Sequence, residues 1–385
     1  MNNKLKICVI VLNSVYYDPR VRKQIAEYIR CGHEVHVVGY RCPRYDEDKV
    51  RQIPAPTNIV YVDKYAGKQH SPLKKLLRER LRNQALTEAI LATNPQVIHA
   101  NDYDALVPAY AAVKKLGCAL IYDSHEIYME NDFAKRLPSA YIRYMRWNEK
   151  RMCRRLDQMV CVSHAAADYF AEAYGIPVPM VVTNCALQRE MATPRDKHEC
   201  FEILNHGQFY EGRGYDIMVE AAPLLRDLPD VCLAMRGFGR MEHQLRSRVE
   251  ELGADNVRFY PGVLVEELIP EATRSHVGVA ITIPICLNFE MSVSNKLFEY
   301  AAAGLPVIMS DIPEHRYLND KYDFGVILEE NTPECFAKTV RMLYEDRDLY
   351  RRLADNALTL SREVNWETEF ACLIQREREL VHEKK

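Results

Sequence analysis

The chain of 385 residues is longer than a single hydrophobic core usually spans, so two domains are expected. Its apolar share of 48% predicts a folded protein rather than a disordered one, and no apolar run reaches the roughly 18–20 residues of a membrane span. The sequence shows no signal peptide, and its 12 cysteines form no C-x-x-C pair, so a cytosolic protein without a zinc ribbon or a redox motif is expected.

The net charge of −3 is divided unevenly along the chain. Residues 1–190 carry 28 basic and 20 acidic side chains, a balance of +8, whereas residues 191–385 carry 23 and 34, a balance of −11. Opposite signs indicate two domains with different surface partners. Nucleic acid is not among the expected partners, because the isoelectric point is near 6.5 and no recognition module is present.

The first half of the chain alternates short β-rich runs with amphipathic helical patterns. The predicted strands cover residues 6–13, 34–40, 58–65, 96–102, 119–126, 158–163 and 180–185. Parallel strands need helical crossovers, so this alternation predicts a doubly wound parallel sheet. The polar segment 186–200 has no period and is predicted to be a linker.

The pattern then restarts, with predicted strands at residues 201–207, 231–237, 256–262, 276–284, 305–311 and 324–328. The sequence therefore predicts an α/β protein of two Rossmann-like domains, 1–186 and 187–365, followed by a helix at 366–385. In such a pair the carboxyl ends of both sheets face each other across a cleft, and the loops after the strands are where ligands bind.

Two segments of the first half are basic and amphipathic, "SPLKKLLRERLRNQAL" (71–86) and "YIRYMRWNEKRMCRRL" (141–156). Each is predicted to be a helix with cations on one face and Leu, Met, Tyr or Trp on the other. The pattern suits an anionic membrane surface, and it equally suits a solvated face packed on a core. Both interpretations remain open at this level.

The loop after the first strand of the second half, "NHGQFYEGRG", places Gly207, Gly212 and Gly214 around Arg213 directly before a helix. Glycines let backbone N–H groups approach an anion, and arginine offers a bidentate fork to phosphate. An ordinary strand-to-helix turn is the alternative. No glycine follows the first strand of the chain, so the fingerprint of a dinucleotide-dependent hydride transfer enzyme is missing.

The segment "MSVSNKLFEYAAAGLPVIMSD" (291–311) places Lys296 and Glu299 three residues apart on a predicted helix at the mouth of the second sheet. Lys296 could reach a diphosphate, and Glu299 could accept two hydrogen bonds from a ribose diol. The alternative is an ordinary surface ion pair.

The order of "GQFYEGRG", "MRGFG", "VRFYPGV" and "SNKLFEYAAAGLPVIMSD" resembles the retaining glycosyltransferases of family 4, also called glycosyl transferases group 1. In the first half "DPRVRKQI", "VIHANDYDAL", "YDSHEIY" and "MVCVSHAAADYF" are similar to the same family. The resemblance covers nearly the whole chain and implies the GT-B fold. It also implies an N-terminal acceptor domain, a C-terminal nucleotide-sugar domain, and a last helix that crosses back to the first domain.

The resemblance also implies roles for particular residues. Glu299 matches the second glutamate of the Glu-x7-Glu motif, which holds the nucleotide ribose, and Lys296 with Arg213 matches the cations at the diphosphate. His125 matches a histidine that lines the transferred sugar, and Arg20 belongs to a loop that closes over donor and acceptor. The remaining expected contacts are Gly207, Gly214 and Gly237 for the nucleotide, and His99 and Glu290 for the sugar or acceptor; a purely structural role for His99 was weighed equally.

The sequence departs from the family at two of these points. Gln208 replaces the arginine after the loop glycine, and Met291 occupies the position of the first glutamate of Glu-x7-Glu, with Glu290 one residue early. The implied reaction is transfer of a sugar from a UDP- or GDP-linked donor to a saccharide or lipid-linked saccharide, with retention, in surface polysaccharide or glycan synthesis. No metal or other cofactor is expected. Alternatives are an epimerase or phosphorylase on the same fold, or a non-catalytic partner of another transferase. Peripheral attachment to the inner membrane face would fit the basic first half.

Overall fold

The structure is a computed structural model, and it describes residues 4–14, 18–40, 56–62, 72–188 and 194–384. The chain forms two compact units, which are described separately here. Unit 1 comprises Met1–Thr183 and Glu369–Lys385, and unit 2 comprises Asn184–Thr368. The sequence placed the boundaries after residue 186 and before residue 366. The assignment of one unit to the acceptor and the other to the nucleotide sugar stays a prediction.

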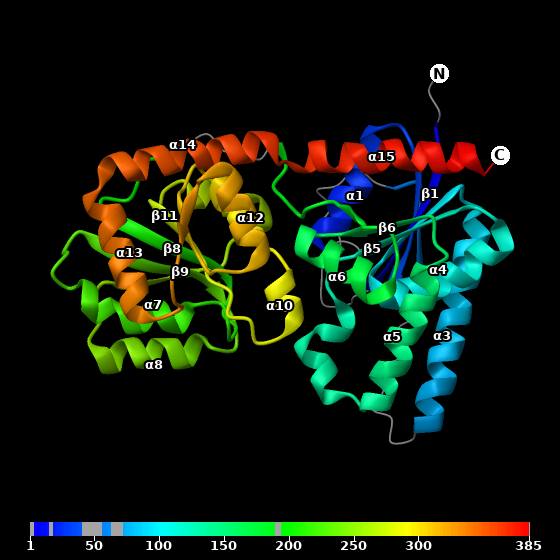
Figure 1. Cartoon of the computed structure of the whole chain (residues 1–385), viewed down its shortest axis with the longest axis horizontal. Helices are drawn as coiled ribbons and strands as arrows, with labels where there is room; N and C mark the ends of the chain where they lie inside the picture. The colour runs from blue at the N-terminus through cyan, green and yellow to red at the C-terminus, as the bar shows by residue number, and fades with distance from the viewer. Residues whose placement is uncertain (1–3, 15–17, 41–55, 63–71, 189–193, 385) are drawn as a thin grey trace. The chain divides into compact units, whose positions relative to one another are not determined.

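Unit 1 is built on a parallel sheet with helices on both faces (Figure 1). Among the described residues its strand order is β3 (Asn58–Val62), β2 (Glu34–Tyr40), β1 (Lys6–Ser14), β4 (Val97–Asn101), β5 (Ala119–Ser124), β6 (Gln158–Cys161) and β7 (Met180–Val181). Its helices are α1 (Pro19–Arg30), α3 (Pro72–Thr93), α4 (Asp102–Leu116), α5 (Ser139–Cys153), α6 (His164–Tyr174), the short turns η1 (Tyr128–Glu130) and η2 (Asp132–Arg136), and most of α15 (Trp366–Glu383).

The central strands of unit 1 are buried on both faces, because helices cover both. Every residue of β4 and β5 is buried. Local sequence signals set the helix ends. Asp18 caps α1 by accepting from the backbone N–H groups of Arg20 and Val21, and Pro19 occupies the first helical position, where its missing N–H costs nothing.

Unit 2 repeats the architecture with a second parallel sheet. Its described strands run in the order β10 (Val257–Pro261), β9 (Val231–Phe238), β8 (Phe201–Gln208), β11 (Val277–Ala280), β12 (Val307–Met309) and β13 (Gly325–Ile327). Its helices are α7 (Tyr215–Ala221), η4 (Ala222–Leu225), α8 (Glu242–Leu252), α9 (Val265–Ala272), α10 (Leu287–Met291), α11 (Asn295–Ala302), α12 (Pro313–Tyr322), α13 (Pro333–Glu345) and α14 (Arg347–Glu363).

The core of unit 2 lies between this sheet and its helices, around fully buried Ile203, Leu233 and Phe336. Helix α11 approaches the sheet closely at Gly278 of β11. A Cβ added there would lie 2.2 Å from Cγ of Tyr300, so only glycine lets this aromatic ring rest on the strand. The contact fixes the position of α11, the helix that carries Lys296 and Glu299.

In each sheet the strand order reverses beside the first strand of the unit, between β1 and β4 in unit 1 and between β8 and β11 in unit 2. Chains leaving two such neighbouring strands turn to opposite faces of the sheet, which opens a crevice at their carboxyl ends. The two-domain α/β prediction is confirmed, and it makes these two crevices the places to examine.

Several predicted strands are shorter in the structure, and 305–311, for example, forms a strand only at Val307–Met309. The run 180–185 pairs only at Met180–Val181, and the run 276–284 leaves the sheet after Ala280, because Ile283 instead donates its backbone N–H to the carbonyl of Gly212 at 2.9 Å. The predicted linker 186–200 is also revised. Residues 189–193 lie outside the described residues. The rest packs on unit 2, where Arg195 pairs with both Glu267 and Glu271.

Candidate active site

The crevice of unit 2 is formed by the end of β8, the glycine loop that follows it, and the start of α11. Gly207 and Gly237 are register partners on β8 and β9, and a Cβ at Gly237 would lie 1.8 Å from the carbonyl oxygen of Gly207. Gly214 has φ +74°, and a Cβ there would lie 2.5 Å from Cβ of Ile281. Close backbone approach thus requires glycine at Gly237, packing against Ile281 requires it at Gly214, and a φ of +120° favours it at Gly207, whatever else these residues do.

Lys296 points into this crevice from the first turn of α11. Its Nζ donates to Oδ1 of Asn205 at 2.7 Å and to the hydroxyl of Tyr215 at 3.4 Å, and its Cε would lie 3.3 Å from a Cβ at Gly207. Asn205 is oriented by its own Nδ2, which donates to the carbonyl of Arg213 at 3.0 Å. Burial, followed by the nearby charge of Arg213, lowers the pKa of Lys296 to about 7, and Glu299 opposes part of that shift.

Arg213 lies on the glycine loop with its guanidinium stacked 4.3 Å from the ring centroid of Phe289 on α10. Burial lowers its pKa, but an arginine keeps its charge at every relevant pH. Glu290 and Met291 belong to the same short helix as Phe289. The structure therefore places the stretch that departs from the family beside the arginine of the loop.

Glu299 lies one turn after Lys296 and is held by His206. Its Oε2 lies 2.7 Å from Nε2 of His206, whose ring stacks on Tyr300 with centroids 4.5 Å apart. The glutamate side chain is 24% exposed, whereas that of His206 is 1% exposed. A fixed, partly exposed carboxylate at this position suits a ligand with two neighbouring hydroxyl groups.

Sequence reasoning missed three supporting residues of this crevice. Asn205 and His206 lie in the second half of β8, and Tyr215 starts α7. Their positions near a strand end and at a helix start could have indicated that they lie at the mouth of the sheet. Their contacts with Lys296 and Glu299 could not be predicted, because these form only where α11 packs against the sheet.

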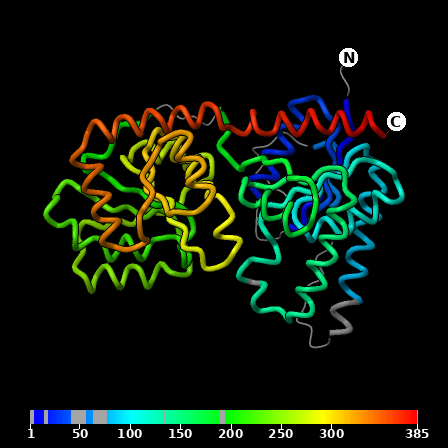
Figure 2. The backbone as a smooth tube through the Cα atoms, viewed as in Figure 1, coloured from blue at the N-terminus to red at the C-terminus, as the bar shows by residue number. Residues whose placement is uncertain are grey.

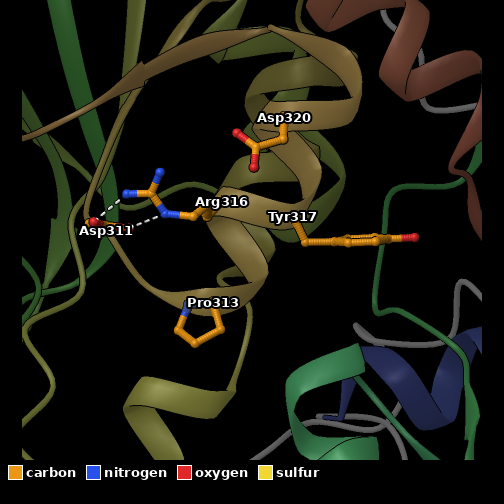
Figure 3. Close-up of a pocket in the computed structure, with 5 residues that line it drawn as sticks. All are labelled: Asp311, Pro313, Arg316, Tyr317 and Asp320. Atoms are coloured by element: carbon orange, nitrogen blue, oxygen red, sulfur yellow. Dashed lines mark hydrogen bonds and ion pairs between the residues drawn. The ribbon is translucent and has the colours of Figure 1, made fainter.

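A second hollow of unit 2, of about 530 Å³, lies at the start of α12 (Figure 3). Figure 3 shows Arg316 turned onto Asp311, with Nε and Oδ1 2.9 Å apart, and Tyr317 pointing away from the helix. Asp320 and Pro313 complete its lining. Its arginine is already neutralised by Asp311, so this hollow lacks the charge that a diphosphate needs, and the crevice at Lys296 remains the stronger site.

The crevice of unit 1 contains His125, directly after β5. Its Nε2 lies 2.9 Å from Oδ1 of Asn101, and its backbone N–H donates to Oδ1 of Asp102 at 3.0 Å. The amide of Asn101 is oriented by donation from Nδ2 to the carbonyl of Ile10 at 3.3 Å, so Oδ1 faces the imidazole. Two carboxylates approach the other ring nitrogen, Asp102 at 3.5 Å and Asp18 at 3.9 Å.

The backbone around this histidine is strained. Asp102 has φ +64°, a conformation that costs a non-glycine residue about 1–3 kcal/mol and that persists where the surroundings enforce it. Burial raises the pKa of Asp102, with the charge of His125 acting in the opposite direction. Burial, with the charge of Asp102, also raises the pKa of Glu126 to about 7. Backbone strain and perturbed acids are features that cluster at functional sites, so this crevice is a candidate site.

The expected role of Arg20 needs correction. The arginine lies in the first turn of α1 rather than in a loop, and it is buried inside unit 1. Its Nε and Nη2 bind the two carboxylate oxygens of Asp123 at 3.0 and 2.9 Å, and Nη1 donates to the carbonyl of Val182 at 2.8 Å. Burial acts to raise the pKa of Asp123, but the charges of Arg20 and His125 and the hydrogen bond from His99 together outweigh it and hold that pKa well below its usual value. Arg20 is a buried structural cation here, not a closing loop residue.

His99 also lies in the interior, so the expectation of a substrate contact is not supported and the structural alternative holds. Its Nδ1 lies 2.7 Å from the hydroxyl of Tyr28 and its Nε2 lies 3.3 Å from Asp123, with no exposed surface. The hydroxyl of Tyr28 in turn donates to Glu377 of α15. The middle of a strand covered on both faces leaves a side chain no path to solvent.

Metal-binding geometry is not found among the described residues, where no group of three or more His, Cys, Asp or Glu is placed to hold an ion. Asp102 and Asp104 do have the D-x-D spacing, which the sequence interpretation had overlooked. They begin α4 and bind different partners, since Asp104 accepts from the hydroxyl of Tyr128 at 2.9 Å. The expectation of a metal-independent protein stays a prediction.

Comparison with known families identifies the class. Residues 20–187 match the model of Glycosyltransferase Family 4, and residues 200–346 match that of Glycosyl transferases group 1. Together these matches span most of the chain, and the protein belongs to the group 1 glycosyltransferases of GT-B type. No curated protein sequence matches it.

Solved structures with the same fold are distant in sequence. A glycosyltransferase from Rickettsia africae shares 16% identity, covers 98% of this chain and 99% of its own, and superimposes with a TM-score of 0.75. HepE of Anabaena, solved in complex with UDP and glucose, shares 16% identity over 97% of this chain and 100% of its own, with a TM-score of 0.74. Sucrose-phosphate synthase from Thermosynechococcus elongatus shares 15% identity over 99% and 100%, with a TM-score of 0.75.

Proposed function

We propose that this glycosyltransferase uses a UDP- or GDP-linked sugar as donor and transfers the sugar, with retention, to a saccharide or lipid-linked saccharide in glycan synthesis. The observation that carries the proposal is the arrangement of two partly buried cations, Arg213 on the glycine loop and Lys296 on α11, with the fixed carboxylate of Glu299 one turn after Lys296. The binding of UDP and glucose by HepE, a protein of the same fold, supports it.

The proposed chemistry follows from where charge develops. The bond between the anomeric carbon and the diphosphate oxygen breaks, and the nucleotide diphosphate gains negative charge as it leaves. Lys296 and Arg213 stabilise that charge from partly buried positions, where electrostatic effects are stronger than in bulk water. The acceptor oxygen forms the new bond on the same face of the sugar, and its proton passes to the departing phosphate oxygen. Gly207 and Gly214 let backbone N–H groups approach the phosphates.

His125 is proposed to contact the transferred sugar. Asn101 and Asp102 fix the imidazole, so its hydrogen bonds are oriented before substrate arrives, which reduces the entropy lost on binding. The position of each histidine explains why a sugar contact is proposed for His125 and not for His99. One histidine follows its strand and reaches solvent, and the other lies within its strand.

The test begins with thermal shifts of the full chain with UDP-, GDP- and ADP-sugars, followed by product analysis with the donor that responds. Transfer to a saccharide with the donor's anomeric configuration retained is expected. Arg213→Ala should lower kcat and kcat/KM together, because the arginine acts on charge that grows in the transition state. EDTA or added Mg²⁺ should change the rate little.

Other outcomes would redirect the assignment. An epimerised sugar nucleotide as product would favour an epimerase on this fold. No response to any nucleotide would favour a non-catalytic partner of another transferase. A steep requirement for Mg²⁺ or Mn²⁺ would contradict neutralisation of the diphosphate by Lys296 and Arg213.

Attachment to an anionic membrane through unit 1 is a further part of the proposal. Helix α3 exposes Leu77 and Leu81, and α5 exposes Trp147 at 57% beside the exposed Arg143. The predicted division of α5 into a cationic and an apolar face is only partly correct, because Arg146 pairs with Glu130 within unit 1. No helix of the described residues is long and apolar enough to cross a bilayer.

Co-sedimentation with vesicles tests the attachment. We expect binding to vesicles containing phosphatidylserine at low salt, release by high salt, and weaker binding of Trp147→Ala and Arg143→Glu. Arg316→Ala, an exposed cation of unit 2, is the control. If the wild-type protein stays in the supernatant at low salt, the exposed side chains of α3 and α5 are a solvated face.

A further inference from the structure

Unit 1 contains a hollow of about 450 Å³ between α3, the start of α4, and α5. Residues of all three helices line it, and α3 and α5 can be followed in this part of unit 1 in Figures 1 and 2. The volume falls within the roughly 300–1,000 Å³ of small-molecule sites. None of the residues placed in the two crevices lines it, and the proposed transfer gives it no role.

Tyrosines dominate the apolar part of the hollow. Tyr103, Tyr128, Tyr141 and Tyr144 line it, and the rings of Tyr103 and Tyr128 lie in contact with centroids 5.6 Å apart and a 41° tilt. The hydroxyl of Tyr103 accepts from Nδ2 of Asn148 at 3.2 Å. Hydrogen bonds of this kind fix the rings, so the aromatic faces are presented with little entropy left to lose on binding.

The polar part of the lining is balanced in charge. Arg80 and Arg82 are matched by Glu79 and Asp104. A phosphate group would therefore find no excess of positive charge here, unlike at Lys296 and Arg213. An alkyl chain would separate these charged groups from water without replacing the lost hydrogen bonds, which is costly.

A carbohydrate satisfies both parts of this lining. The C–H groups on one face of a sugar ring pack against aromatic rings, and its hydroxyl groups donate to carboxylates and accept from guanidinium groups. Tyrosines beside Arg–carboxylate pairs form the mixed lining that a neutral, hydroxyl-rich ligand needs.

The hollow is also connected along the chain to the histidine crevice. Asp102 binds the backbone of His125, and the next residues along α4, Tyr103 and Asp104, line the hollow. Tyr128 follows His125 by one short turn and lines the hollow as well. A chain of sugars with one end near His125 could therefore extend into the hollow along the same edge of unit 1.

We propose that this hollow binds a saccharide portion of the acceptor that lies away from the reacting hydroxyl group. The inference rests on the proposed function, since it names the part of unit 1 that would select a saccharide acceptor. It adds a site that recognises sugars already present in the acceptor, so the enzyme would favour longer glycans over single sugars.

Saturation-transfer NMR on the full chain tests the site without a donor, with maltotriose, mannotriose, galactotriose and triacetylchitotriose as probes. We expect at least one trisaccharide to bind, with saturation strongest on one ring face. Tyr141→Ala should weaken that binding about tenfold, the size expected for loss of one aromatic contact. Trp147→Ala, a change on the same helix outside the hollow, should leave it unchanged, as should saturating UDP.

A second variant covers the case in which Tyr141→Ala does not fold. Arg80→Ala removes an exposed side chain at the rim and should weaken trisaccharide binding several-fold while circular dichroism stays unchanged. The inference is overturned if no trisaccharide binds, if Tyr141→Ala and Trp147→Ala have equal effects, or if octyl glucoside binds through its alkyl chain alone. Because no donor is present, such failure is separate from a failed nucleotide thermal shift, which would overturn the proposed function instead.

Discussion

The pKa of Lys296 makes a quantitative prediction about nucleotide binding. In the free protein this pKa is lowered to about 7, chiefly by burial. A bound diphosphate would place negative charge against Nζ and raise the pKa again, so the lysine should bind a proton together with the nucleotide. Above about pH 7, where the phosphate is fully ionised, affinity should then fall as the free lysine loses its proton.

The size of the effect follows from the fraction protonated. With a free pKa of about 7, roughly half of the free protein carries the ammonium at pH 7 and about 1% at pH 9, so UDP should bind about 50-fold more weakly at pH 9. The phosphate itself contributes little to this slope, because its second ionisation, with a pKa near 6, is largely complete by pH 7.

Titration calorimetry of the nucleotide that responds in the thermal shift, in two buffers of different ionisation enthalpy at pH 8, measures the proton directly. We expect uptake of about 0.9 proton per site, the fraction of free lysine that is neutral at that pH. Lys296→Arg keeps its charge throughout and should remove both the uptake and the slope, while Lys296→Met should bind weakly at every pH. Constant wild-type affinity from pH 7 to 9 would refute the reasoning.

Three further predictions concern individual contacts. Glu299→Ala should weaken binding of the nucleotide by about 1.5–3 kcal/mol in calorimetry, the range for hydrogen bonds to a charged group, whereas Glu330→Ala, an exposed carboxylate of the same unit, should not. Gly214→Ala should destabilise unit 2 by about 1–3 kcal/mol in urea unfolding because its Cβ meets Ile281, and Gly253→Ala, which shares the positive φ but meets only the far end of Arg226, should cost less; equal costs would contradict the packing argument. Arg20→Met should destabilise unit 1 by about 3–5 kcal/mol at pH 7, since it leaves Asp123 buried and unpaired. That loss should shrink gradually as pH falls from the unfolded pKa of Asp123, about 4, toward its much lower folded pKa. A loss of the same size at pH 7 and at pH 2 would contradict the ion-pair account.

Much of the fold could be predicted from the sequence because its signals are local. Apolar runs of strand length separated by helical periods fixed the strands of both sheets, and Asp18 with Pro19 marks the start of α1 within its own first turn. The predicted strand at 276–284 was too long because hydropathy alone does not show that Ile283 turns to the carbonyl of Gly212.

Candidate site residues could be predicted where their position at the end of a strand or the start of a helix indicated the role. They could not be predicted where the role depends on whether the side chain is buried. Lys296 was predicted from its position at the start of a helix and His125 from the family resemblance, and the structure places each of them in a crevice. The predicted substrate contacts of Arg20 and His99 were wrong. The local sequence pattern around a cation or a histidine is the same whether its side chain faces solvent or a buried carboxylate. Asp123 and Glu377, which hold these two residues, lie 103 residues from Arg20 and 278 from His99 along the chain, and no local pattern announces such pairing.

Helix α15 has a consequence for how the protein is made. Unit 1 lacks Phe370, Leu373 and Glu377 of its interior until the last residues of the chain have left the ribosome. Unit 2 is complete in sequence by residue 368 and can fold first, although domains usually form from the N-terminus onward. At about 5–20 residues per second the nascent first unit waits roughly 10–40 s with its sheet partly uncovered. The N-terminal half should therefore be the part that depends on chaperones during synthesis. A fragment ending at residue 183 should aggregate. A circular permutant, with residue 385 joined to residue 1 and new ends in unit 2, should stay folded.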